Sequence, residues 1–419
     1  MTPPTTIELV GTILFLIAVL HTFMTRQFER LAHLQPGHAG LWHLLGEVEV
    51  VFGFWSFVFI AFYAIAAGTG AATHYLESLD FTEPMFIFVI MVIAGSKPIL
   101  QLAAATVRGI ARLIPAPRPV AFYFVALAFT PLLGSFITEP AAMTLAALML
   151  RDHVFAKEIS NRLRYLTLGV LFVNVSIGGT LTPYAAPPVL MVAGKWGWDI
   201  AFMLSTIGWK AAIATVANAL IATLLFQAEL RRLPPTAVAK QEAPFVILAL
   251  HVAFLAGVVV FAHHPVVFMG IFLFFLGVAQ AYPRYQDDRL ILREGLLVGF
   301  FLMGLVILGT QQRWWLQPAL SGMDATALYF GAAALTAITD NAALTYLGSL
   351  VEGIDDTFKY ALVTGAVTGG GLTVIANAPN PAGFAILRGS FPDGAISPVS
   401  LFLYALPPTL IAMAAFLLL

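Results

Sequence analysis

The chain has 419 residues, of which 60% are hydrophobic and only 10% are charged, and its mean hydropathy is +0.89. Soluble domains carry about 25% charged residues, so this composition excludes a soluble fold and indicates a polytopic helical membrane protein. The sequence also lacks the alternation of apolar and polar residues that is typical of a transmembrane barrel. The net charge of −1 gives nucleic-acid binding no support. The absence of cysteine excludes disulfides, thiolate metal sites and thiol nucleophiles.

Apolar runs long enough to cross a bilayer, which takes about 20 residues, recur along the chain. The first, Ile7–Met24, has neither the positive residues nor the cleavage site of a signal peptide, and we expect it to remain as a helix. The later runs are Trp42–Ala67, Pro84–Val107, Tyr165–Gly194, Ala201–Phe226, Pro244–Ala262, Pro265–Ala281, Leu290–Thr310, Phe358–Leu387 and Ser397–Leu419. Two further stretches, Val120–Leu150 and Thr326–Leu350, are longer than one span and carry an acidic motif near the middle.

The charges of the loops decide how these two long stretches are placed, because Lys and Arg concentrate on the cytoplasmic side. If Val120–Leu150 crossed the membrane once, the basic segments 108–118 and 151–164 would lie on opposite faces. A re-entrant hairpin instead leaves both segments inside, and the same model puts the acidic cluster Glu352–Asp356 outside. The sequence therefore predicts ten crossings, two hairpins and both termini in the periplasm.

Each half of the chain would then hold five crossings, and because five is odd the second half must run opposite to the first. The predicted fold class is an all-α polytopic membrane protein, an inverted repeat of two five-crossing halves, each with a re-entrant helical hairpin and an interrupted transmembrane helix. The predicted domains are an N-terminal repeat over 1–230 (scaffold helices 1–110, hairpin and broken helix 118–195), a linker over 231–243, and a C-terminal repeat over 244–419 (scaffold helices 244–311, hairpin and broken helix 324–390).

Two nearly identical motifs mark the predicted hairpin tips: Thr138-Glu139-Pro140-Ala141-Ala142 and Thr339-Asp340-Asn341-Ala342-Ala343. Each is followed by a glycine-rich break, Gly178-Gly179-Thr180-Leu181-Thr182 in the first half and Gly369-Gly370-Gly371-Leu372-Thr373 in the second. Either glycine cluster alone could equally serve close helix packing. Paired at matching positions and followed by prolines, the clusters indicate helix breaks that border a polar centre.

Glu139 and Asp340 are the sharpest functional candidates, because a carboxylate within a membrane is costly and marks ion pathways or proton relays. Burial favours the protonated form unless a cation is present, so Na⁺ and H⁺ would compete for one site. Together with Asn341 these two acids form the predicted Na⁺ ligands. The alternative is a structural pairing with a buried Lys or Arg, although neither tip contains a cation.

Hydroxyl and amide groups at the tips and breaks complete the predicted ion-binding set. The members are Thr138, Glu139, Thr180, Thr182, Thr339, Asp340, Asn341, Thr373, Asn377 and Asn380. Asn377 and Asn380 lack polar counterparts in the first half, which predicts an asymmetric site in a symmetric frame. Glu47 and Glu49 are read as interfacial in preference to a second proton path, and Lys97 could pair with either tip acid.

This pattern resembles the ion transporter superfamily of secondary transporters, which includes arsenite permeases, sodium–proton antiporters and divalent-anion:sodium symporters. The similarity covers Val120–Gly194 and Thr326–Gly389, and through the two tip motifs it is closest to the bacterial sodium–proton antiporter branch. It implies a homodimer with a fixed scaffold and a transport domain that moves as an elevator. It also implies hairpin-tip roles for the Thr-acid motifs and broken-helix roles for Thr180, Thr182, Thr373 and Asn377. The anion symporters carry Ser-Asn-Thr where this chain has Thr-Glu-Pro and Thr-Asp-Asn, which argues against a dicarboxylate substrate.

The leading functional hypothesis is therefore Na⁺/H⁺ antiport in a bacterial inner membrane, with Na⁺ or Li⁺ and H⁺ as substrates, the lipid bilayer as surroundings and no cofactor. The alternative is Na⁺-coupled symport of a small organic or inorganic anion, and a third hypothesis is a receptor that transports nothing. No hydrolase motif or P-loop is present, so we expect no enzymatic activity. We expect the homodimer to form through Ile7–Ala67 and Pro244–Ala281.

Overall fold

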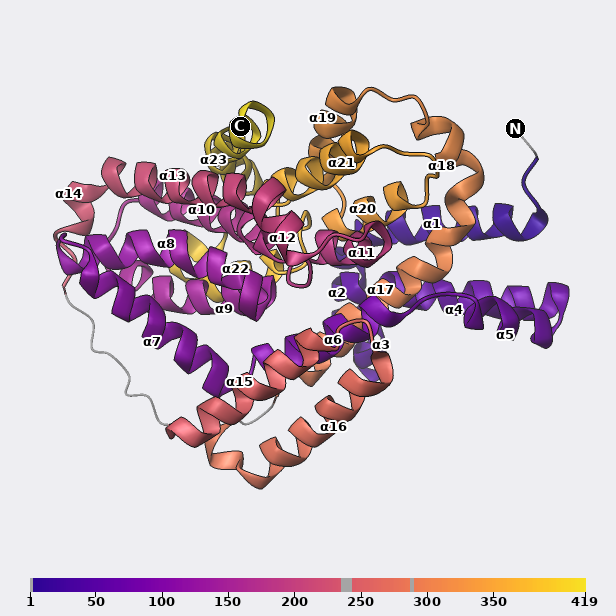
Figure 1. Ribbon diagram of the computed structural model, residues 1–419, viewed down its shortest axis with the longest axis horizontal. Coiled ribbons are helices and arrows are strands. Elements are labelled where there is room, and N and C mark those ends of the chain that lie inside the picture. Colours follow the sequence, from indigo (N-terminus) through magenta and orange to yellow (C-terminus); the bar gives the residue numbers. More distant parts are fainter. Residues whose placement is uncertain (1–2, 235–242, 287–289) are drawn as a thin grey trace. The chain divides into compact units, whose positions relative to one another are not determined.

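The computed structural model describes residues 3–234, 243–286 and 290–419, and within these ranges it consists of helices without a β-strand (Figure 1). The chain forms two compact units. Unit 1 comprises Met1–Phe88, Leu292–Met323 and Tyr346–Asp355, and unit 2 comprises Val89–Ile291, Asp324–Thr345 and Asp356–Leu419. Each unit thus draws on both predicted halves. Most of the predicted linker, residues 235–242, lies outside the described residues.

Unit 1 is built from helices near the N-terminus and from a later segment around residue 300. Its elements are α1 (Thr6–Thr22), α2 (Thr25–Leu34), η1 (Pro36–His38), α3 (Ala39–Leu45), α4 (Val48–Ala67), α5 (Thr69–Glu77), the first part of α6 (Thr82–Ala94), α17 (Leu292–Gly309), η6 (Thr310–Gln312) and α18 (Arg313–Leu320). Helix α17 packs tightly on α4, because Gly304 lies directly against the backbone of Phe52 and leaves no space for a side chain.

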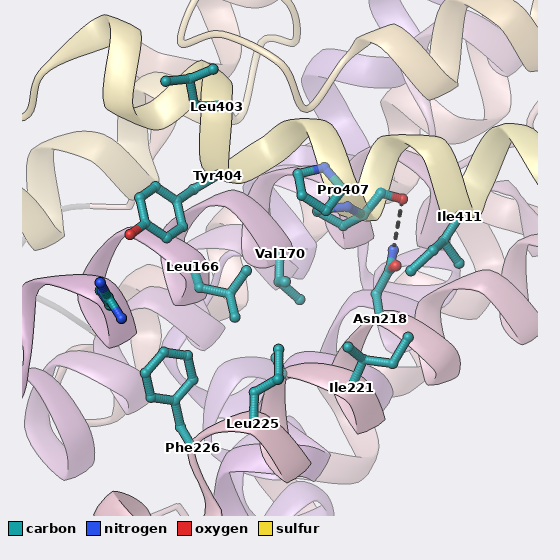
Figure 2. Close-up of a pocket in the computed structure, with 13 residues that line it drawn as sticks. Leu166, Val170, Asn218, Ile221, Leu225, Phe226, Leu403, Tyr404, Pro407 and Ile411 are labelled. Carbon is teal, nitrogen blue, oxygen red and sulfur yellow. Dashed lines mark hydrogen bonds between the residues drawn. The ribbon is translucent and has the colours of Figure 1, made fainter.

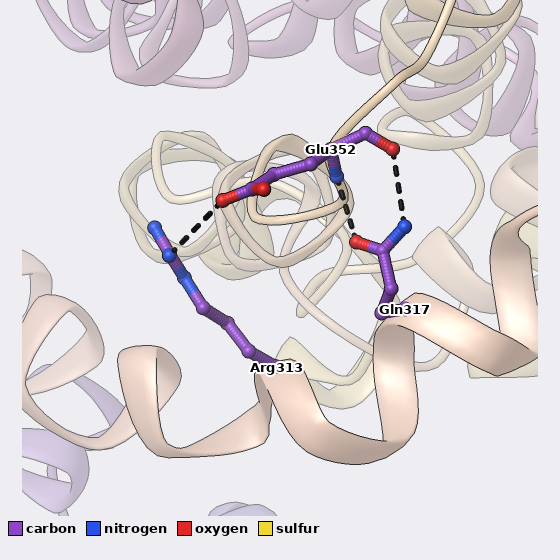
Figure 3. A network of polar contacts seen from close by, with 3 residues as sticks. All are labelled: Arg313, Gln317 and Glu352. Carbon is purple, nitrogen blue, oxygen red and sulfur yellow. Dashed lines mark hydrogen bonds and ion pairs between the residues drawn. The ribbon is translucent and has the colours of Figure 1, made fainter. Parts of the chain in front are cut away.

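The acidic loop of unit 1 is held to α18 mainly through amide groups (Figure 3). Gln317 accepts a hydrogen bond of 2.8 Å from the backbone N–H of Glu352, and its Nε2 donates to the Glu352 carbonyl at 3.1 Å. The Arg313–Glu352 ion pair spans 3.5 Å between exposed side chains, and such pairs contribute at most about 1 kcal/mol. The two hydrogen bonds with the side-chain amide of Gln317 therefore hold this loop in place.

Unit 2 contains the remaining helices. They are α7 (Lys97–Leu113), α8 (Arg118–Ile137), α9 (Glu139–Leu150), η2 (Arg151–Phe155), α10 (Asn161–Gly178), η3 (Gly179–Leu181), α11 (Pro187–Trp196), α12 (Ile200–Phe202), η4 (Met203–Gly208), α13 (Trp209–Leu225), α14 (Gln227–Leu230), α15 (Phe245–Val260), α16 (Pro265–Ala281), η5 (Pro283–Tyr285), α19 (Ala325–Thr336), α21 (Asp356–Gly369), α22 (Asn380–Leu387), η7 (Arg388–Ser390), η8 (Pro392–Gly394) and α23 (Pro398–Leu418). Helix α20 (Asn341–Ser349) contributes its first residues to unit 2.

Helices α8 and α9 form an antiparallel pair that is joined at Thr138. The outer ends of the pair meet, because the ring of Phe122 near the start of α8 stacks on His153, just after α9, with centroids 4.1 Å apart. Around this pair lie α7, α10 and α13, and buried Leu127, Met143 and Phe172 belong to the common core. The chain therefore enters and leaves this hairpin at the same end.

Most helix bounds agree with the predicted apolar runs, but Pro84–Val107 is not one straight span. It forms α6 and α7, which are bent by 67° at Gly95-Ser96. Pro98 in the first turn of α7 has no N–H and its ring clashes with a preceding helical turn, so one continuous helix cannot form. The predicted run Trp42–Ala67 is likewise divided, into α3 and α4.

Six of the described helices are long and apolar enough to cross a membrane, or seven if the bent pair α6–α7 counts as one span. Four predicted crossings are not among them: α1, α15 and α16 are apolar but have only 17, 16 and 17 residues, and the predicted run Phe358–Leu387 forms α21, which has 14 residues, and α22. Conversely, one of the six is α8 (Arg118–Ile137), which the sequence assigned to the first re-entrant hairpin. The protein is thus a multi-pass membrane protein that is helical throughout its described residues, and the ten-crossing arrangement stays a prediction.

Candidate functional site

The first predicted tip is a strained junction between two helices. Thr138 has φ +75° and ψ 151°, the only positive φ at a non-glycine residue in the described ranges. A β-branched residue is strongly disfavoured there, and such strain clusters at functional sites. Thr138 is 3% exposed, and its Oγ1 has no hydrogen-bond partner in the described chain.

Glu139 begins α9 and is fully buried, with 0% of its surface exposed. Its Oε2 accepts a hydrogen bond of 2.9 Å from Nδ2 of Asn377, and its Oε1 has no partner among the described residues. Burial of a carboxyl group with one oxygen unpaired is costly unless a proton or a cation accompanies it. The hydrogen-bond partner of this carboxyl group is thus an asparagine and not the buried Lys or Arg of the alternative hypothesis.

Glu139 lies directly against the first glycine break. A Cβ at Gly179 would approach both Cγ and Oε1 of Glu139 to 2.5 Å, so only glycine leaves room for the acid. Ser135, one turn before the tip, accepts at Oγ from the Leu181 N–H (2.9 Å) and donates to the Gly178 carbonyl (2.7 Å). The glycines therefore provide both the helix break and the close packing that the sequence left as alternatives.

The second tip is arranged differently from the first. Asp340 is half-buried, and its Oδ1 accepts from the N–H groups of Ala342 (2.9 Å) and Ala343 (3.1 Å), which caps the start of α20. Asp340 lies close enough to Glu139 for the two carboxyl groups to interact electrostatically. Thr339 donates to the carbonyl of Leu335 in its own preceding helix at 2.8 Å.

Asn341 is fully buried next to the second glycine break. Its backbone N–H donates to the carbonyl of Ala376 at 3.2 Å. Neither side-chain atom of its amide has a partner within the described residues. Gly370 lies against both this amide and the hydroxyl of Ser176, with no space for a side chain. The tip of the second half is thus brought to the broken helix α21–α22.

The second break carries the two predicted asparagines. Asn380 is fully buried and donates from Nδ2 to the carbonyls of Gly370 (2.7 Å) and Thr373 (2.8 Å), which fixes the unwound segment. Asn377 is 1% exposed and donates to Glu139 as described above. In the described chain, the side-chain oxygens of both asparagines are without a hydrogen-bond donor.

Matching hydrogen bonds connect each break to its own tip. Thr182 and Thr373 hold the same place in the Gly-Gly-Thr-Leu-Thr and Gly-Gly-Gly-Leu-Thr motifs. Thr182 Oγ1 donates to the Ser135 carbonyl at 2.5 Å, and Thr373 Oγ1 donates to the Ala337 carbonyl at 2.8 Å. Thr180, by contrast, donates to Ile177 in its own helix at 2.7 Å.

The structure gathers the predicted residues into one unit. All of them belong to unit 2, where Glu139, Asn341, Asn377 and Asn380 each present a buried oxygen without a donor in the described ranges. Such a set of carboxylate and amide oxygens suits a hard cation. The hydroxyl groups of Thr180 and Thr339 donate to carbonyls of their own helices. These two residues are therefore weaker candidates for ion ligands.

Sequence reasoning missed Ser135 and Ser176, which lie in predicted apolar runs. Ser176 Oγ donates to the carbonyl of Val367 at 2.7 Å and so joins the two broken helices. The sequence signal for Ser135 is its place one turn before the tip motif, and that for Ser176 is its place just before the glycine pair Gly178-Gly179. Of the other charged residues, Lys210 donates to the hydroxyl of Tyr360 at 2.9 Å, and Glu47 accepts from Arg293 in unit 1.

The comparison with known proteins identifies a family for this chain. No curated protein matches the sequence. Residues 6–419, nearly the whole chain, match the model of a family described as "Putative Na+/H+ antiporter". The chain therefore belongs to this antiporter family.

Proposed function

We propose that this protein is a secondary active transporter that exchanges Na⁺ for H⁺ at Glu139. The observation that carries the proposal is the fully buried Glu139 carboxyl group, which has one oxygen held by Asn377 and the other without a partner in the described chain. An ionisable group in this position needs a proton or a cation. Na⁺ and H⁺ would then bind in alternation, which is the physical basis of antiport.

The balance of donors and acceptors supports a cation in preference to an anion. Helix N-termini bind anions through free N–H groups, but three of the relevant helices carry proline at their first or second position, which removes one or two of these N–H groups. These prolines are Pro140 in α9, Pro187 and Pro188 in α11, and Pro381 in α22. At the fourth N-terminus, that of α20, Asp340 already accepts the hydrogen bonds from Ala342 and Ala343. The alternative, Na⁺-coupled symport of a small anion, therefore has the weaker chemical support.

We propose Glu139, Asp340 and Asn341 as the principal Na⁺ ligands, with Asn377 as the residue that orients Glu139. Asp340 affects Glu139 electrostatically, and we propose that the two acids titrate as a pair. Thr138, Thr180, Thr182, Thr339, Thr373 and Asn380 complete the site or fix its backbone. Both ions are substrates, and the proposal requires no cofactor and no enzymatic activity.

We further propose that the two halves form an inverted repeat with re-entrant hairpins, as in the ion transporter superfamily. The matched bonds of Thr182 to Ser135 and of Thr373 to Ala337 support this repeat. All proposed ligands belong to one compact unit, which is what an elevator mechanism requires of its moving part. The proposal includes a homodimer in the bacterial inner membrane, with both termini in the periplasm.

The experiment that tests the proposal is ion exchange in proteoliposomes that contain a pH-sensitive dye. An imposed pH gradient should collapse on addition of Na⁺ or Li⁺ with wild-type protein and should persist with Glu139→Gln. Labelled small anions, offered with and without a Na⁺ gradient, test the symport alternative. Na⁺-driven anion uptake without proton movement would replace antiport by symport.

A further inference from the structure

A groove distant in sequence from the tip motifs runs between three helices of unit 2 (Figure 2). It has a volume of about 430 Å³. Its walls are regular stripes: α10 contributes Arg162, Leu166 and Val170 at intervals of four residues, α13 contributes one face from Asn218 to Phe226, and α23 contributes one face from Leu403 to Ile411. Spacings of three, four and eight residues place each set on one side of its helix. The groove therefore follows the helix axes.

The two ends of the groove differ in chemistry. Tyr404 and Phe226 lie toward one end in Figure 2, and Asn218 and Ile411 lie toward the other. Arg162 belongs to the first turn of α10 and is one of the basic residues of the segment 151–164. Aromatic residues and arginine gather where a membrane meets water. The groove thus has an interfacial, positively charged end and an apolar course toward the membrane interior.

The helices that line the groove are candidate membrane spans, over Asn161–Leu181, Ile200–Leu225 and Pro398–Leu418. The groove therefore runs across the bilayer, and the stripe from Arg162 to Val170 alone is about 12 Å long at 1.5 Å per residue. This course is parallel to the acyl chains of the surrounding lipid. Exposed Leu225 (68%) and Leu403 (57%) form its outer edges.

The charges near the mouth of the groove favour an anion. Arg162 is exposed, and in the described chain its side chain has no hydrogen bond or ion pair. Of the acidic residues nearby, Glu229 accepts from both the backbone N–H (2.5 Å) and the hydroxyl (3.0 Å) of Ser160 and is thereby occupied. Glu158 follows Lys157 in the adjacent loop, and Arg231 and Arg232 follow α14. Positive charge is therefore in excess at this end.

We propose that this groove binds one anionic phospholipid, with its phosphate on Arg162 and one acyl chain along the stripes of α10, α13 and α23. A second copy of the chain fits less well. A two-fold axis along the membrane normal would place the same end of both grooves at the same depth, and Arg162 of one copy would then meet an equally positive surface. A phosphodiester supplies the opposite charge, and its acyl chain matches the apolar lining.

Lipid binding is measured on the full-length protein by native mass spectrometry in mild detergent, with phosphatidylglycerol and phosphatidylethanolamine of identical acyl chains as probes. We expect tighter binding of phosphatidylglycerol to the wild type. Arg162→Gln should weaken it about fivefold, the effect of roughly 1 kcal/mol per basic residue near an anionic lipid surface, while phosphatidylethanolamine binding stays unchanged. Arg284→Gln, which changes an exposed arginine in η5 that does not line the groove, is the matched control and should bind like the wild type.

A second pair of variants tests the acyl-chain contact. Leu225→Trp fills the groove from an exposed position, whereas Leu224→Trp changes the neighbouring, equally exposed residue that does not line it. Leu225→Trp should reduce binding of both lipids, and Leu224→Trp should not. Wild-type affinity of Arg162→Gln for phosphatidylglycerol would overturn the proposal. A shift of the monomer–dimer distribution by Leu225→Trp without loss of lipid would overturn it too and would assign the groove to a second copy.

Discussion

Asn377 Nδ2 donates a hydrogen bond of 2.9 Å to Oε2 of Glu139, although the two residues are 238 positions apart. The bond joins the tip of the first hairpin, at the start of α9, to the break in the second broken helix. It also orients the carboxyl group, so that Oε1 is the oxygen left for an ion. Movement of the second break relative to the first hairpin would therefore change the position of the Glu139 carboxyl group.

The first prediction concerns this bond. Asn377→Ala removes the donor to Glu139 and a buried amide oxygen, and the apparent Na⁺ affinity in the exchange assay should fall at least about tenfold, because a hydrogen bond to a charged group contributes about 1.5–3 kcal/mol. Asn161→Ala, which changes an exposed asparagine at the start of α10, serves as the control. Unchanged Na⁺ affinity in Asn377→Ala would remove this residue from the site.

The second prediction is the direction of the pH dependence. If one proton and one Na⁺ compete for Glu139, lowering the pH favours the proton, and the apparent Na⁺ affinity should weaken, by up to about tenfold per pH unit. The measurement is Na⁺-dependent collapse of a pH gradient from pH 6 to 9. An apparent affinity that does not vary with pH would contradict competition at a carboxyl group.

The third prediction separates charge from structure at Asp340. Because an amide oxygen can also cap a helix, Asp340→Asn should keep the bonds to Ala342 and Ala343 while it removes the charge. We expect this variant to fold with wild-type thermal stability and to lose exchange. Asp340→Ala should lose both exchange and about 1 kcal/mol of stability. Wild-type exchange in Asp340→Asn would make this acid a structural cap.

How much of this site the sequence could predict depends on the kind of signal. The two tip acids and the glycine breaks can be recognised in the sequence, because a charge or a Gly-Gly pair inside an apolar run has few explanations. Helices do end at Ile137, Thr336, Gly178 and Gly369, next to the predicted motifs. Whether the hairpins are re-entrant depends on the position of the membrane, and whether the breaks bind an ion depends on the ion itself. Both therefore stay predictions.

Other features had weaker signals in the sequence. Ser135 and Ser176 each look like a single small polar residue in an apolar helix, which most often bonds to its own backbone, yet they bond to Gly178 and Val367 across the fold. The 67° bend at Gly95-Ser96 had a local signal in Pro98, but the hydropathy of the run is continuous through it. Pairings such as Lys210 with Tyr360 depend on tertiary packing, which one sequence does not reveal.

The fourth prediction tests the close approach of Gly179 to Glu139. Gly179→Ala places a methyl group 2.5 Å from Cγ and Oε1 of the acid, so either the tip or the break must shift. We expect exchange to be lost and the thermal stability to fall. Gly109→Ala in α7, where a Cβ would meet no atom within 4 Å, is the matched control and should leave exchange intact. Active Gly179→Ala protein would show that this packing is dispensable.

The last prediction concerns the side of the membrane at which the first hairpin begins and ends. The 4.1 Å stacking of Phe122 on His153 brings the two ends of the α8–α9 pair together, so the loops on either side of it should face the same compartment. Because the chain has no cysteine, Arg112→Cys at the end of α7 and Ala156→Cys after η2 give single labelling sites at exposed positions before and after the hairpin. Both should react with a membrane-impermeant maleimide only after the cytoplasmic face is opened, in keeping with the excess of basic residues around them. Glu352→Cys in the acidic loop, whose side chain is 79% exposed, should react from the periplasm in intact cells. If Arg112→Cys and Ala156→Cys react from opposite sides, α8 and α9 together cross the membrane, and both the re-entrant hairpin and the inverted repeat are wrong.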